Sequence, residues 1–317
     1  MSLLELQPAD EHDENVVYKQ PLELELVPPT ETGEQPIEHR SVLLMNFSVP
    51  EKHASNAAEL KTREDSVVNR ARNALLNITN QDTGEVTQDL YTLEHEERTV
   101  RSYDVVATRI LDAASKDAGF QQRYNITDEE LSALRDDLEI NLLGVAIHDV
   151  GKDDWEINRL TKLDTKLKPH EIKKVAEHVA RGVAFINNSE WDSRTKQINS
   201  TIDGAHHDYK PKSPKDENPV SQPVPDELQL ASQILPVVDI LDVVTSGQAE
   251  GRFYRDAATT VEEVIEGIRQ EFEGNHLELI LDMAFGADKV RQIKEQQQRL
   301  GHLAVVKERE DIAAVAS

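Results

Sequence analysis

Most of the chain has the composition of α-helices, and this feature limits its fold class more than any other. From about residue 54 onward Ala, Leu, Glu, Arg and Gln predominate, while Gly and Pro stay sparse until the loop that follows residue 207. The first five are strong helix formers, whereas Gly and Pro are the weakest. The sequence therefore predicts an all-α protein. The expected helices are 54–79, 86–118, 128–148, 169–187, 190–206, 227–246, 260–273, 275–285 and 286–300.

Residues 1–52 differ in composition from the rest of the chain. They are rich in Asp and Glu and contain six of the 13 prolines, which disfavours helices. Residues 22–27 alternate apolar and acidic side chains and residues 41–49 are mostly apolar, so each could form a strand. Two interpretations stay open: a partly disordered acidic leader, or a small β appendage that contacts a protein partner. The other expected domains are a helical domain at 53–300 and a tail at 301–317.

The chain is strongly acidic and contains no cysteine. Its 60 acidic and 35 basic residues give a formal net charge of -25, which repels nucleic-acid polymers and anionic membrane surfaces. The lack of Cys excludes disulfides, thiolate catalysis, iron–sulfur clusters and Cys-type zinc sites, so any metal must be bound by His, carboxylate or water. The apolar runs are too short for a membrane-spanning helix. We therefore expect a soluble, cytoplasmic protein.

Histidines and aspartates mark the helical region as a candidate metal site. His148 and Asp149 directly follow the apolar stretch 140–147, so an imidazole and a carboxylate are expected together at the rim of the core. Asp239 is flanked by Val and Ile, where an unpaired carboxylate would be costly to bury. Imidazole and carboxylate ligands from several helices are what a two-metal centre requires. The further candidate ligands are His178, His206 and His207.

Several strings of the sequence correspond to motifs of one known family. Residues 148–152 read His-Asp-Val-Gly-Lys, residues 167–171 read Leu-Lys-Pro-His-Glu, and residues 206–208 read His-His-Asp. The strings Asp-Ile-Leu-Asp-Val-Val-Thr-Ser, from residue 239, and Arg-Phe-Tyr-Arg-Asp-Ala, from residue 252, follow. With His95 upstream, this ordered set resembles the HD superfamily of metal-dependent phosphohydrolases, and most of all its HD-GYP branch. The resemblance covers roughly residues 85–285.

The resemblance implies a helical HD-domain bundle and a phosphodiesterase that uses metal-activated water. It adds His95 to the six ligands named above and makes Asp149 the bridge between two divalent ions. Asp149 and Lys152 are then the expected catalytic residues, and Lys152, Lys162 and Arg252 are expected to bind substrate. The expected substrate is a cyclic dinucleotide such as cyclic di-GMP. The ligand types favour iron or manganese, while zinc and magnesium stay open.

The sequence departs from the HD-GYP pattern in two places. The stretch 208–214 contains no Gly-Tyr-Pro, the segment that shapes the substrate side of the pocket in the branch, which puts cyclic di-GMP specificity in doubt. Tyr91 stands where members with a third metal carry Glu, so two ions are expected. Two alternatives stay open, a nucleotide phosphohydrolase of the wider superfamily and a non-catalytic signalling module. The oligomeric state stays open as well.

Overall fold

The computed structural model describes six stretches of the chain, and all structural statements below refer to them. They are residues 66–163, 167–206, 223–246, 248–249, 252–253 and 260–292, with side chains undescribed from 245 to 253. Segment 1–52, the tail 301–317, the loop after residue 207 and His207 itself therefore lie outside the described residues.

Helices make up most of the described chain, which confirms the all-α prediction. The only described strands form two antiparallel hairpins of two residues per strand, β1 (Ile78–Thr79) with β2 (Val86–Thr87) and β3 (Gln248–Ala249) with β4 (Arg252–Phe253). The helices are α4 (Ser66–Leu76), α5 (Leu90–Lys116), α6 (Phe120–Tyr124), α7 (Asp128–Asp136), α8 (Leu138–Val145), α9 (Trp155–Thr161), α10 (Pro169–Asn187), α11 (Ser193–Ala205), α12 (Gln229–Ser246), α13 (Val261–Glu271) and α14 (Leu277–Phe285), with short 3-10 helices η1 (Val150–Asp153) and η2 (Asp226–Leu228).

The predicted helix boundaries are correct for α10 and wrong around the first hairpin. Helix α4 ends at Leu76 rather than at residue 79, because the chain then enters β1. Helix α5 starts at Leu90 rather than at 86. Asp89 is its N-cap, and the carboxylate of Asp89 accepts a hydrogen bond from the amide of Thr92. The β1–β2 hairpin is thus formed by residues that the composition had assigned to two helices.

The predicted helix 128–148 is wrong, because the structure divides it. Helix α7 ends at Asp136 and α8 ends at Val145, so His148 lies in a turn beyond the helix end. Thr127 is the N-cap of α7, and its side chain and that of Glu130 form a capping box. Helices α6 and α9 were not predicted.

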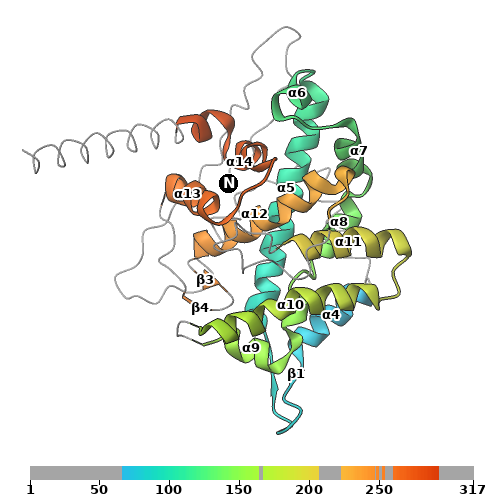
Figure 1. Ribbon diagram of the computed structural model, residues 1–317, viewed down its shortest axis with the longest axis vertical. Helices are drawn as coiled ribbons and strands as arrows, with labels where there is room; N and C mark the ends of the chain where they lie inside the picture. Colours follow the sequence, from blue (N-terminus) through green and yellow to red (C-terminus); the bar gives the residue numbers. More distant parts are fainter. Residues whose placement is uncertain are drawn as a thin grey trace, which may run out of the picture.

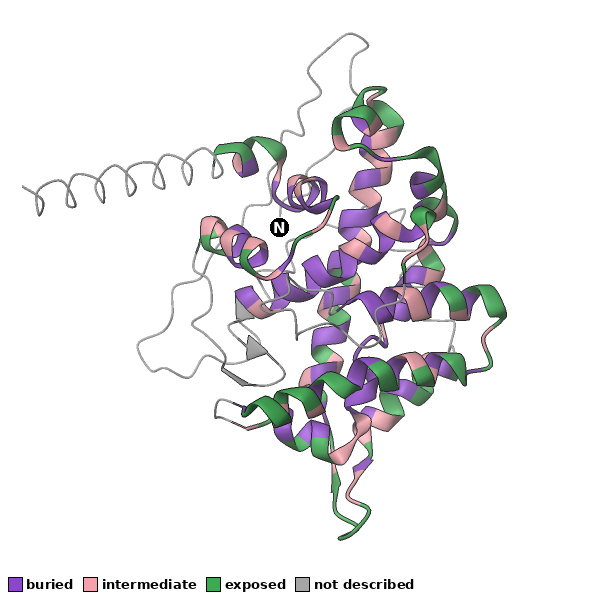
Figure 2. Cartoon of the chain, in the orientation of Figure 1, coloured by how far each residue is buried: buried purple, intermediate pink, exposed green. Residues whose placement is uncertain are grey.

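Helix α5 is the axis of the fold. It has 27 residues and runs through the centre of the molecule, where α12 packs across it (Figure 1). Helix α11 packs on both α8 and α10, and α8 packs on α5, while α13 and α14 pack against α12. Helix α12 is buried along much of its length, whereas α9 and α10 are exposed on their outer faces (Figure 2). Residues from α5, α8, α10, α11 and α12 therefore meet in the interior.

Gly151 in η1 allows that turn to pack directly on α10. A Cβ atom at this position would lie 2.0 Å from the backbone carbonyl oxygen of His178. A backbone atom cannot rotate away as a side chain can, so only glycine fits. The contact places the turn that carries His148 and Asp149 against the helix that carries His178.

Replacing Gly151 by Ala should therefore lower the free energy of unfolding by about 2–3 kcal/mol, the magnitude seen for overpacked cores. Urea unfolding would measure the change. Gly119→Ala is the matched control, because a Cβ there meets only an Asp117 side-chain oxygen at 3.4 Å, and it should change stability by less than about 0.5 kcal/mol. Equal changes in the free energy of unfolding in the two variants would contradict the close packing of Gly151 on α10.

Candidate metal centre

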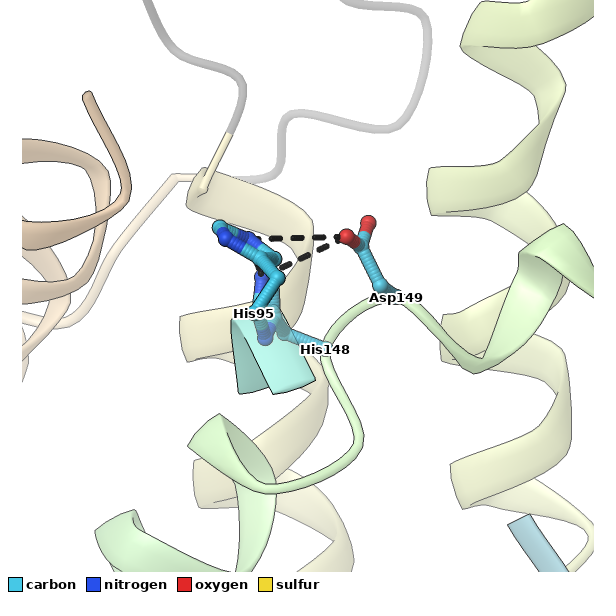
Figure 3. Close-up of side chains that lie close together, drawn as sticks. All are labelled: His95, His148 and Asp149. Atoms are coloured by element: carbon cyan, nitrogen blue, oxygen red, sulfur yellow. Dashed lines mark hydrogen bonds and ion pairs between the residues drawn. The ribbon is translucent and has the colours of Figure 1, made fainter. Parts of the chain in front are cut away.

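Four histidines and two aspartates meet in the buried interior. His95 comes from α5, His178 from α10 and Asp239 from α12. His148 and Asp149 lie in the turn after α8, and His206 directly follows α11. All six side chains are buried. Figure 3 shows the rings of His95 and His148 side by side and facing the carboxylate of Asp149.

The carboxylate of Asp149 lies between two groups of imidazoles. Its Oδ2 atom lies 3.7 Å from Nε2 of both His95 and His148. Its Oδ1 atom lies 3.3 Å from Nε2 of His178 and 3.9 Å from Nε2 of His206. Oδ1 of Asp239 lies 3.0 Å from Nε2 of His95. We call His95, His148, Asp239 and Asp149 Oδ2 half-site A, and His178, His206 and Asp149 Oδ1 half-site B.

The Nδ1 atoms of the four histidines all have acceptors, which turns the four Nε2 atoms toward the centre. Nδ1 of His148 donates to the carbonyl of Val145 at 2.8 Å, and Nδ1 of His178 donates to that of Val175 at 2.6 Å. His206 repeats this contact with the carbonyl of Asp203 at 2.5 Å. Each acceptor lies three residues before its histidine. Such a bond fixes the ring orientation and leaves Nε2 as the ligand atom.

His95 is oriented by a carboxylate instead of a carbonyl. Its Nδ1 lies 2.8 Å from Oδ2 of Asp242. Arg98 donates to Oδ1 of Asp242 from Nε at 2.6 Å and to Oδ2 from Nη2 at 3.0 Å. Burial alone would lower the pKa of His95, but the hydrogen bonds to Asp239 and Asp242 outweigh it and raise the pKa to about 10. A cation between His95 and Asp239 would replace the Nε2 proton.

The side chain of Lys152 forms an ion pair with Asp149, and its role at a substrate phosphate stays a prediction. Its Nζ lies 2.6 Å from Oδ2 of Asp149, and the side chain is buried. Burial would raise the pKa of Asp149, but the charges of Lys152 and His148 and the hydrogen bond with His178 hold it well below its usual range. Asp149 is therefore ionised in the interior.

Four residues near the centre had no predicted role. Asp242 and Arg98 orient His95, and a sequence signal for Asp242 existed because it lies in the string that starts at Asp239. Glu96 and Asp203 are buried beside the centre. Burial and the negative charge of Asp149 raise both of their pKa values. No sequence pattern distinguishes these two acids from surface carboxylates on helices.

The remaining predicted residues are not placed at the cluster. His207 lies outside the described residues, and for Arg252 only the backbone, in β4, is described. Lys162 is exposed at the end of α9, and its Nζ donates to the carbonyl of Gln88 at 2.8 Å. Lys162 thus makes neither a hydrogen bond nor an ion pair with half-site A or B.

The two half-sites have the donors that a metal centre requires. Ligand atoms of His95, His148 and Asp149 all lie within 4.8 Å of one another, and so do those of Asp149, His178 and His206. Each group offers imidazole nitrogens and one oxygen of Asp149, and Asp239 adds a second carboxylate to half-site A. This set of donors suits zinc, manganese or iron. The buried group could therefore hold a metal ion.

Comparison with known proteins gives no relative: no protein-family model, no curated protein and no solved structure matches the chain. Among the described helices, none is both long and apolar enough to cross a membrane.

Asp242→Asn tests the orientation of His95. The variant keeps the shape of the side chain but removes the carboxylate charge that favours the imidazolium form, so the pKa of His95 should fall by about 1 or more. NMR titration of the histidine ring in chelator-treated protein would measure it. The control is Asp112→Asn, which removes an exposed carboxylate that pairs with Lys116 on the same helix as His95. An unchanged pKa in Asp242→Asn would contradict the assignment.

Proposed function

We propose that the protein is a metal-dependent phosphodiesterase of the HD-GYP-like type, and that its substrate is a cyclic dinucleotide. The observation that carries the proposal is the position of Asp149, whose two carboxylate oxygens each face a separate group of imidazoles. A single carboxylate shared in this way is suited to bridge two divalent ions. The resemblance of the motifs to HD-GYP proteins supports the same function.

Half-site A would hold one divalent ion and half-site B the other. Iron or manganese suits the mixture of imidazole and carboxylate better than zinc or magnesium does. Such a pair of ions supplies a water of lowered pKa and stabilises the charge on the phosphoryl oxygens. A hydrolase of this kind needs no cysteine or serine nucleophile, which agrees with the Cys-free composition.

The protein's own residues prepare the centre for this chemistry. Asp149 stays ionised because Lys152 and the imidazoles surround it. The carbonyls of Val145, Val175 and Asp203 hold three rings so that their Nε2 atoms face the centre. Orientation before the reaction lowers the barrier, since no ligand has to rearrange when charge develops on the phosphate.

A second candidate is a nucleotide phosphohydrolase of the wider HD superfamily. The absence of Gly-Tyr-Pro from the stretch 208–214 favours it, because this segment shapes the substrate side of the pocket in HD-GYP proteins. Both candidates use the same centre and differ only in the phosphoester. A panel of cyclic di-GMP, other cyclic dinucleotides and mononucleotides separates them.

Metal content and hydrolysis test the proposal together. Protein purified without chelator should hold about two ions per chain, and His178→Ala should lose ions and lower kcat by at least about 100-fold. His170→Ala is the matched control, since His170 lies on the same helix α10 but is exposed.

Two outcomes would contradict the proposed function. Folded wild-type protein that holds no metal would refute the centre. Protein that holds two ions but hydrolyses nothing in the panel, with Asp149→Ala equally inert, would favour the non-catalytic signalling module instead.

A further inference from the structure

Lys152 places a positive charge at one of the two oxygens that would bridge the metals. Its Nζ lies 2.6 Å from Oδ2 of Asp149, the oxygen of half-site A. The side chains of both residues are buried, so water screens this ion pair little. Metal ions bind carboxylate oxygen at about 2.0–2.2 Å. A metal on Oδ2 must therefore lie close to the ammonium group of Lys152 or displace it.

The other oxygen of Asp149 has a different environment. Oδ1 faces Nε2 of His178 at 3.3 Å and Nε2 of His206 at 3.9 Å. Both rings have their Nδ1 atoms bound to carbonyls, which leaves Nε2 as the ligand atom. The two half-sites share one carboxylate, yet the Lys152 ammonium pairs with the oxygen of half-site A.

We propose, on the basis of the metal centre proposed above, that Lys152 is an internal cation that makes the two half-sites unequal in their affinity for metal ions. Half-site B takes the first ion, and half-site A takes the second more weakly because that ion competes with the Lys152 ammonium group for Asp149 Oδ2. The displaced ammonium group then becomes available to an anionic phosphoester. Binding of the second ion is thereby coupled to binding of substrate.

The backbone around Lys152 allows such a movement of the side chain alone. Lys152 lies in η1, and the preceding Gly151 fits against the carbonyl of His178 with no room for a side chain. Arg181 of α10 also donates to the carbonyl of Gly151 at 3.2 Å. The turn is therefore held from two sides, while the flexible four-carbon stem of a lysine can change its rotamer.

Calorimetric titration of chelator-treated, full-length protein with Mn²⁺ tests the proposal. The wild type should show two binding steps of unequal affinity. Lys152→Met keeps an unbranched side chain only one atom shorter and removes its charge, so the weaker step should tighten by about 10-fold or more. The stronger step should change less. Lys162→Met is the control, because Lys162 is exposed and binds the Gln88 carbonyl, and it should leave both steps unchanged.

A second variant covers the case in which Lys152→Met does not fold, which circular dichroism would reveal. Lys152→Arg keeps the positive charge beside Oδ2 and carries it on a rigid, permanently charged guanidinium, so it should weaken the second step by about 10-fold. If the wild type binds two ions but the weaker step is unchanged or weakened in Lys152→Met, this inference is overturned and the proposed function stays intact. A wild type that binds no Mn²⁺ would overturn both.

Discussion

The buried carboxylate of Asp149 is the constraint on which the rest of the structure depends. An ionised carboxylate in a protein interior is costly unless positive charge or hydrogen-bond donors surround it. Lys152 and imidazoles from α5, α10 and the ends of α8 and α11 provide that environment. These helices come from distant parts of the sequence, so a fold in which they meet around α5 and α12 is required for the site to exist.

Helix ends, more than helix faces, position the ligands. His148 and His206 each follow the last residue of a helix, where carbonyls have no amide partner within the helix. Their Nδ1 atoms use such carbonyls three residues earlier as acceptors. The same hydrogen bond gives the helix-end carbonyl a partner and orients the imidazole ring. One local contact therefore contributes both to the stability of the helix end and to the position of the ligand. Gly151 allows the turn that follows His148 and Asp149 to pack on α10.

The sequence allowed the helical class and much of the site to be predicted, because both depend on local composition and on a linear order of motifs. The described histidines and aspartates of the predicted ligand set do converge, and α10 has the predicted bounds. The break at Asp137 could not be predicted, since residues 128–148 have uninterrupted helical composition. There the carboxylate of Asp137 binds Arg194 of the distant helix α11. The partner of Lys152 was likewise missed, because spacing along the chain does not distinguish a neighbouring aspartate from a bound phosphate.

The most direct test of the two half-sites is anomalous X-ray diffraction at the manganese absorption edge, from crystals of the full-length protein saturated with Mn²⁺. Two anomalous peaks are expected, on opposite sides of Asp149. Oδ1, His178 and His206 should contact one peak, and Oδ2, His95 and His148 the other. A single ion bound by both oxygens of Asp149, or no peak at this carboxylate, would contradict the account.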